Sequence, residues 1–321
     1  NPGELYIEAD PISAMQFKGG VMYDIGDMLS FFNAIPVVGK ASDNSSLWAN
    51  FGMSEKAPIL DNVIDDETSV LSTDPLNEKF LSFELGIKSY SNDGTMAAKF
   101  NFYHTRWSDR SQTKTVQDQG DSSDDLKVFV SGINQLHQGI EFELSAQINE
   151  MFRLDLGVGY GNWRYTEDAN GSYVDNGVSK EVVYALKDLK VGDMPQASFL
   201  AALGATPIEG ANVELMYRFY TLHHADWGVD SREMPAARNL VYKAPAYGIM
   251  DLHASYQIPY ELGPVSPEVY LQVFNLLNTV YIQDASDNSK YNGFNGNGTA
   301  DDAEVFLGLP TSFNLGLRFN F

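Results

Sequence analysis

The stretch Phe313-Asn314-Leu315-Gly316-Leu317-Arg318-Phe319-Asn320-Phe321 decides the fold class of this chain. Its odd-numbered residues are apolar, and its even-numbered residues are polar or glycine. Because successive side chains of a β-strand point to opposite faces, this alternation predicts a strand with one apolar and one polar face. A strand between lipid and water needs this pattern, and so does a surface strand of a soluble sandwich. The choice between the two depends on how often the pattern recurs.

The alternation recurs along the whole chain. It is longest in 140–148 and 152–160, which are separated only by Asn149-Glu150-Met151, the turn of a tight hairpin. Shorter versions occupy 81–88, 212–219 and 250–257. We expect eleven strands, at about 13–24, 46–55, 78–90, 95–108, 136–148, 151–165, 195–206, 211–223, 246–257, 267–281 and 304–321.

The connections between these strands differ in length. Short turns are expected at 91–94, 149–151, 207–210 and 258–266, and long polar segments at about 56–76, 109–135, 167–194, 224–245 and 283–302. Transmembrane barrels have short turns on the periplasmic side and long loops outside. The sequence therefore predicts an all-β protein, a transmembrane antiparallel β-barrel in an outer membrane, with its long loops outside and its C-terminus in the periplasm.

Composition agrees with this class. The chain has 321 residues and no cysteine, so neither a disulfide framework nor a thiolate metal site is available. Its 17 tyrosines, 19 phenylalanines and 4 tryptophans can supply the aromatic girdles of a barrel. The mean hydropathy of −0.24 is compatible with a barrel, which offers only every second residue to lipid. A formal net charge of −22 argues against a nucleic-acid partner, which would require clusters of Lys and Arg.

The strand count predicts that residues 1–321 are the C-terminal part of a larger barrel. A closed bacterial barrel has an even number of strands, and we count eleven. The first strand runs toward the periplasm, and the sequence shows neither an initiator methionine nor a signal peptide. One missed strand would instead make a complete barrel of about twelve strands.

Four short motifs carry a resemblance to a known family. They are Ala49-Asn50-Phe51-Gly52 leading to Ser54-Glu55-Lys56-Ala57-Pro58, Asp74-Pro75-Leu76-Asn77-Glu78 leading to Glu84-Leu85-Gly86, Val273-Phe274-Asn275-Leu276-Leu277-Asn278 followed by Tyr281, and Leu307-Gly308-Leu309-Pro310 before the terminal strand. In this order they resemble stretches of TonB-dependent outer-membrane receptors. The second motif is imperfect here, and Thr311 replaces the family's usual arginine. The resemblance extends over nearly the whole chain.

The resemblance implies an architecture and a set of partners. Such receptors have a barrel of about 22 strands that is closed by an N-terminal plug domain. They bind a scarce ligand outside and import it with energy supplied by TonB. The implied partners are the lipid bilayer, the TonB complex acting through a plug that is not in this chain, a surface lipoprotein, and a small ligand such as a siderophore, cobalamin, a glycan or a peptide. The fold does not select among these ligands.

The sequence offers no catalytic constellation, so we expect no enzyme, no cofactor and no metal site. Adjacent His223 and His224 would point to opposite faces of a strand, which disfavours a shared ion. We expect a polar wall facing the lumen, formed by Glu84, Glu141, Glu143, Arg153, Asp155, Arg218, Asp251 and Arg318. These charges would either pair with one another and with a plug, or be solvated by water in the lumen. The aromatic side chains expected to contact a ligand, because planar rings stack on sugars or chelates, are Trp163, Tyr165, Tyr173, Trp227 and Tyr291. Interface anchoring or loop packing is the alternative for each of them.

The functional hypothesis is therefore an outer-membrane active-transport receptor. Two alternatives remain open at this point: a passive porin-like channel, and a soluble β-rich glycan-binding protein. A porin would lack the plug, and a soluble protein would have to cover its apolar faces with a packed core.

Overall fold

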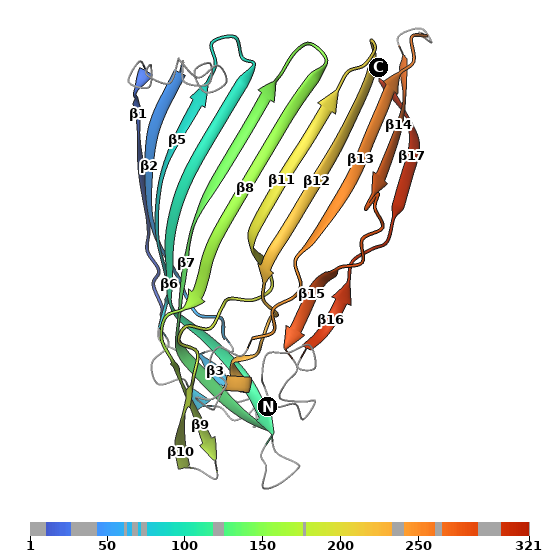
Figure 1. The fold of residues 1–321 in the computed structure, drawn as a ribbon. Coiled ribbons are helices and arrows are strands. Elements are labelled where there is room, and N and C mark those ends of the chain that lie inside the picture. The colour runs from blue at the N-terminus through green and yellow to red at the C-terminus, as the bar shows by residue number, and fades with distance from the viewer. Residues whose placement is uncertain are drawn as a thin grey trace.

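The computed structural model describes residues 11–26, 44–60, 63–65, 70–71, 76–117, 125–175, 178–232, 241–260, 265–287 and 303–320. In these ranges the chain forms one large curved antiparallel sheet and two small hairpins (Figure 1). Eleven strands follow one another across the sheet: β1 (Gln16–Asp24), β2 (Asn44–Lys56), β5 (Glu78–Tyr90), β6 (Met96–Gln117), β7 (Asp125–Gln147), β8 (Phe152–Tyr165), β11 (Pro195–Ala205), β12 (Ala211–His223), β13 (Tyr247–Gln257), β14 (Ser266–Phe274) and β17 (Ser312–Asn320). The prediction of an all-β antiparallel fold with eleven strands is confirmed.

The remaining elements are short and lie off this path. The strand β9 (Ala169–Asp175) pairs with β10 (Val178–Tyr184) and with β7. Two hairpins stand apart, β3 (Ile64–Asp65) with β4 (Val70–Leu71) and β15 (Ile282–Asp287) with β16 (Ala303–Leu307). A short 3₁₀ helix, η3, covers Val229–Arg232. Among the described residues, no helix is long and apolar enough to cross a membrane.

The two ends of the sheet differ, and we call them the short-turn end and the long-loop end. Residues 91–95, 148–151, 206–210 and 258–265 connect strands at the short-turn end, drawn at the top of Figure 1. The hairpins β3–β4, β9–β10 and β15–β16 lie at the opposite, long-loop end. One connection departs from the expected alternation: residues 25–43 join β1 to β2 at the short-turn end and are long, and most of them lie outside the described residues.

The predicted strand boundaries are wrong in three places, and the predicted loops 56–76 and 167–194 also contain the short strands β3, β4, β9 and β10. The segment 109–135, predicted to be a loop, mostly extends β6 and β7, which pair as far as Gln117 and Asp125. The predicted strand 267–281 ends at Phe274, because Asn275 and Asn278 adopt positive φ angles of 50° that a strand cannot continue through. The predicted strand 304–321 is two strands, β16 and β17, separated by residues 308–311, which include Gly308 and Pro310.

The apolar face of the sheet is uncovered within the described part of the chain. Cross-strand register aligns its side chains in rows, one of which joins Leu85, Phe102, Ile140 and Tyr160. Exposed fractions reach 71% for Phe313, 69% for Leu315 and 67% for Val21. Soluble monomers rarely expose contiguous apolar surface of this extent. The main buried cluster instead lies at the long-loop end, on the ends of β7 and β8, on the β9–β10 hairpin and on the adjoining loops, so within the described residues the sheet does not form one layer of a soluble sandwich.

We expect arginine on the apolar face to destabilise the protein strongly. In the full-length parent protein, Leu154→Arg or Leu215→Arg should each cost about 2–4 kcal/mol, because both leucines lie in one row of the apolar face and the guanidinium would enter hydrocarbon there. Urea unfolding in lipid, followed by the mobility shift between unheated and heated samples, measures this cost.

Gly157→Arg is the matched control, because Gly157 lies on the polar face. The nearest atom to a β-carbon added there is Leu200 Cβ at 3.6 Å, an ordinary contact. Its cost should be clearly smaller than that of the other two variants. Equal costs at the three positions would contradict a lipid-facing surface.

Candidate functional site

The polar face of the sheet carries the charged side chains. The register joins Glu143 to Gly157, Gly157 to Leu200 and Leu200 to Arg218, so Glu143 on β7 and Arg218 on β12 lie on one face although two strands, β8 and β11, lie between them. The same continuity connects all eight residues expected on the polar wall: Glu84, Glu141, Glu143, Arg153, Asp155, Arg218, Asp251 and Arg318. That this face lines a lumen stays a prediction.

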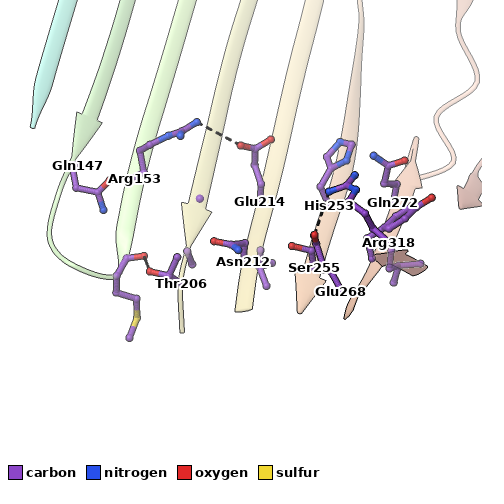
Figure 2. Close-up of a pocket in the computed structure, with 17 residues that line it drawn as sticks. Gln147, Arg153, Thr206, Asn212, Glu214, His253, Ser255, Glu268, Gln272 and Arg318 are labelled. Carbon is purple, nitrogen blue, oxygen red and sulfur yellow. Dashed lines mark hydrogen bonds and ion pairs between the residues drawn. The ribbon is translucent and has the colours of Figure 1, made fainter. Parts of the chain in front are cut away.

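A polar pocket of about 410 Å³ lies on this face near the short-turn end (Figure 2). Arg153 contacts Asp155 at 2.7 Å and reaches toward Glu214 at 3.8 Å. On the other side of the pocket, Arg318 pairs with Glu268 at 3.2 Å. The arginines of both pairs are more than half exposed, so each pair contributes little to stability and its groups remain available to another surface.

The contact between Arg218 and Asp251 is different, because the Asp251 side chain is buried. Asp251 accepts hydrogen bonds from Arg218 Nη2 and, at 2.8 Å, from the backbone N–H of Asn275. Only 4% of the Asp251 side chain is exposed. A carboxylate in this position is tolerated because both of its oxygens are paired.

Asn275 in turn holds the end of β14 against the start of β17. The side-chain amide of Asn275 donates to the backbone carbonyl oxygens of Thr279 at 2.9 Å and Leu309 at 3.1 Å. The backbone carbonyl of Asn275 accepts from Thr311 Oγ1 at 2.7 Å. The motif around Asn275 and the Thr311 position therefore form one hydrogen-bonded unit. Its contact with Asp251 connects this unit to the polar face.

A second pocket on the polar face, of about 430 Å³, is aromatic and lies nearer the long-loop end. Trp163 donates from Nε1 to Tyr103 Oη at 2.8 Å, and its ring lies 5.7 Å from that of His137. The full lining is Phe80, Glu84, Asn101, Tyr103, Thr105, Trp107, His137, Glu141 and Trp163. We call this the aromatic pocket.

Two glycines let the aromatic rings lie against the wall. A β-carbon on Gly139 would come within 2.5 Å of Tyr103 Oη, and one on Gly161 within 2.6 Å of Trp163 Nε1. Each ring therefore occupies space that any other residue would fill. Sequence reasoning identified Trp163 and missed Tyr103, Trp107 and His137. Glycines inside otherwise regular strands were the available signal.

The other aromatic residues expected to bind ligand occupy different surroundings. Tyr165 and Trp227 are 9% and 7% exposed, their ring centroids are 4.8 Å apart, and Tyr173 packs on the same cluster. The structure thus brings three of the five residues together, in the buried cluster at the long-loop end. Tyr291 lies outside the described residues. A direct role of these four in binding stays a prediction.

His223, the last residue of β12, and His224 belong to no group of described residues that could hold a metal ion. Burial is the main cause that lowers the pKa of His224 to about 4, and the positive charge of Lys190 is the second. Across the described ranges, no three His, Asp or Glu side chains are grouped so that they could hold a metal ion.

We expect the buried Asp251 carboxylate to matter much more for stability than the exposed ion pairs. Asp251→Ala should cost about 3 kcal/mol or more, because it leaves Arg218 and the Asn275 N–H without their acceptor. Arg153→Ala, the matched control in an exposed pair, should cost less than about 1 kcal/mol. Urea midpoints of the parent protein in lipid measure both, and similar costs would argue against this division.

Comparison with known proteins gives consistent results. Residues 12–276 match the family model described as TonB dependent receptor-like, beta-barrel. No curated protein matches the chain in sequence. Three solved structures illustrate the similarity in fold.

The ferric-catecholate import receptor Fiu of E. coli K12 is 16% identical, with a TM-score of 0.55 over 94% of this chain and 34% of the receptor. FpvA of P. aeruginosa, solved with a pyoverdine–iron complex, is 16% identical, with a TM-score of 0.56 over 95% of this chain and 32% of that one. The copper transporter OprC is 14% identical, with a TM-score of 0.55 over 86% of this chain and 37% of the transporter. The chain thus spans about a third of the length of each.

Proposed function

This chain belongs to the TonB dependent receptor-like β-barrel family of the Gram-negative outer membrane, and on that premise we propose that it forms part of the barrel wall of an active-transport receptor. The receptor binds a scarce small ligand outside the cell and imports it to the periplasm with energy supplied by TonB. The family match over residues 12–276 carries this proposal.

The two-faced sheet supports an orientation in the membrane. Its apolar face meets lipid, and its polar face lines the lumen, as expected of an outer-membrane barrel. The long-loop end faces the outside and the short-turn end the periplasm, since long loops are external in such barrels. The polar pocket of Figure 2 then lies at the periplasmic side of the wall.

The remaining strands and the plug belong, in this proposal, to the rest of the parent protein. Within the described part, β1 pairs only with β2, and β17 only with β14, so each has an unpaired edge. The half-exposed Arg153 and Arg318 are available to pair with a plug, which is the element on which TonB acts. A surface lipoprotein stays a candidate partner.

We assign the ligand contact to the aromatic pocket and the ligand to the class of metal chelates with planar rings. The Trp163 and Tyr103 rings can stack on such a ligand. Two of the solved relatives are named as receptors of iron chelates and one as a copper transporter. Cobalamin, glycans and peptides are the other outcomes that a binding test would distinguish.

Uptake of a radioactive iron chelate tests the proposed function. The full-length parent, expressed in Gram-negative cells that lack their own siderophore receptors, should take up ⁵⁵Fe bound to catecholate or hydroxamate siderophores only when the cells contain TonB. Trp163→Ala should weaken binding about threefold to tenfold, since an aromatic contact contributes about 0.5–1.5 kcal/mol.

Tyr270→Ala is the matched control for this variant. Tyr270 also lies over a glycine, Gly316, on the polar face, but it is not part of the aromatic pocket. Its effect should stay within about twofold. Equal uptake in cells with and without TonB would instead favour a passive channel.

The unpaired edges generate a second test. Residues 1–321 expressed alone should not form a heat-modifiable, protease-resistant monomer in detergent, because hydrocarbon cannot satisfy the backbone groups of two strand edges. The parent protein should form one under the same conditions. A stable monomer of the isolated segment would contradict the shared barrel and favour a complete, porin-like one.

A further inference from the structure

The apolar face changes character abruptly toward the long-loop end of β6, β7 and β8. Cross-strand register defines successive rows, and the last apolar row includes Phe102, Ile140 and Tyr160. The next row is uncharged polar or histidine, His104, Gln138 and Asn162, and the row after it is Arg106, Leu136 and Arg164. Lys190 extends this last row, because it bridges to Arg164. The arginines thus lie about 13 Å beyond the last apolar row, measured along the strands.

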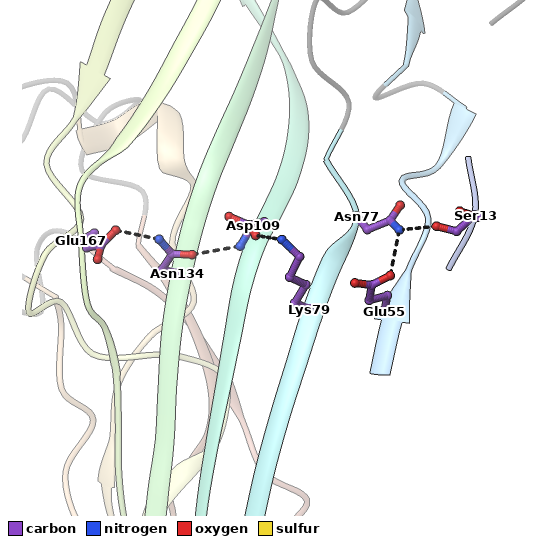
Figure 3. A network of polar contacts seen from close by, with 7 residues as sticks. All are labelled: Ser13, Glu55, Asn77, Lys79, Asp109, Asn134 and Glu167. Atoms are coloured by element: carbon purple, nitrogen blue, oxygen red, sulfur yellow. Dashed lines mark hydrogen bonds and ion pairs between the residues drawn. The ribbon is translucent and has the colours of Figure 1, made fainter. Parts of the chain in front are cut away.

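Hydrogen bonds between polar side chains mark the same boundary on neighbouring strands (Figure 3). Lys79 follows the outward-facing Leu81 toward the long-loop end and donates to Asp109 at 2.9 Å. The chain of contacts continues through Asn134, which accepts from the Asp109 N–H at 2.9 Å and donates to Glu167 at 2.8 Å. Here a carboxylate neutralises the cation within the protein.

The cations of the arginine row are less completely neutralised. Arg106 is exposed and makes no ion pair with any described residue. Arg164 lies 3.7 Å from a single carboxylate, Asp188, and its buried Nε has no hydrogen-bond partner. Lys190 donates at 2.8 Å to the neutral amide oxygen of Asn162.

These positive charges also repel one another. Burial is the main cause that lowers the pKa of Lys190, and the positive charge of Arg164 is the second. Lys190 and Lys243 contribute, after burial, to the low pKa of His224. Such crowding of cations is unexpected in a chain with a net charge of −22, and it is relieved when an anion binds between them.

We propose that Arg106, Arg164 and Lys190 bind the phosphate groups of a lipid in the outer leaflet. Guanidinium groups pair with phosphate oxygens through two parallel hydrogen bonds, and the ammonium group of Lys190 adds a third positive charge. The apolar row ending at Tyr160 contacts the acyl chains of the same lipid. This inference rests on the proposed orientation, with the long-loop end outside. It concerns the outer wall, whereas the proposed transport function concerns the lumen.

Lipid binding to the purified full-length parent tests the proposal. Native mass spectrometry in detergent counts the copies of diphosphorylated lipid A retained, with monophosphorylated lipid A and inorganic phosphate as separate arms. We expect retention to fall in the order diphosphorylated, monophosphorylated and free phosphate. The triple variant Arg106→Gln/Arg164→Gln/Lys190→Gln should bind diphosphorylated lipid A about tenfold to a hundredfold more weakly.

The matched control removes three cations from the opposite face. Lys18→Gln/Lys88→Gln/Lys99→Gln changes the net charge equally, but these residues lie on the polar face, so lipid retention should not change. Asp188→Asn should strengthen binding by removing the one carboxylate that, among the described residues, pairs with the row, and asparagine tolerates the positive φ of 69° at that position. Arg106→Gln alone changes an exposed side chain and provides a variant that folds if the triple variant does not.

Two results would overturn the proposal. One is equal retention of diphosphorylated lipid A by the parent, the Arg106→Gln variant and the triple variant. The other is that inorganic phosphate displaces bound diphosphorylated lipid A as completely as the same concentration of free diphosphorylated lipid A does. Neither depends on TonB or on transport. Failure here and failure of uptake are therefore distinguishable.

Discussion

Hydrocarbon offers no hydrogen-bond partner to a peptide group, and the rest of this structure depends on that constraint. Every strand that crosses a bilayer must satisfy its backbone with its neighbours, so the chain forms an uninterrupted antiparallel ladder from β1 to β17. The ladder leaves side chains, and not the backbone, to distinguish lipid from water. The ion pairs, pockets and turns can therefore form only where the geometry of this ladder allows them. Within the described residues, β1 and β17 each leave one edge of the ladder unpaired.

The alternating pattern was informative only where one face meets lipid. It identified the eleven strands that follow one another across the main sheet, because each has apolar side chains on alternate positions, and it missed β9 and β10. It missed the extension of β6 through Ser111-Gln112-Thr113-Lys114-Thr115, because this stretch contains no apolar residue and therefore shows no alternation. The β9–β10 hairpin was missed for a related reason, since it is stabilised by packing within the loop layer. No local periodicity reports that kind of contact.

The candidate site was predictable in its charges and less so in its aromatic residues. Charged residues on one face of successive strands must share a surface, so the polar wall follows from alternation and register. The aromatic pocket depends on which residues lie opposite one another on β6, β7 and β8, and register cannot be counted from the sequence when turns are uncertain. Tyr165 and Trp227 were expected to contact a ligand because planar rings stack on sugars or chelates, with loop packing as the alternative. They are buried because the loop layer forms a core of its own.

The division of the sheet into two faces also has an evolutionary consequence. In the proposed receptor, residues one position apart along a strand are selected for different properties, compatibility with the membrane on one face and recognition of a solute on the other. Drift in the chemistry of the surrounding lipid can be followed by substitutions at positions such as 102, 140 and 160 without altering the positions between them. Specificity for a new solute can arise at positions such as 103, 139 and 161 while membrane insertion is preserved. Ligand specificity and adaptation to a different membrane can therefore evolve separately, through alternate residues of the same strands.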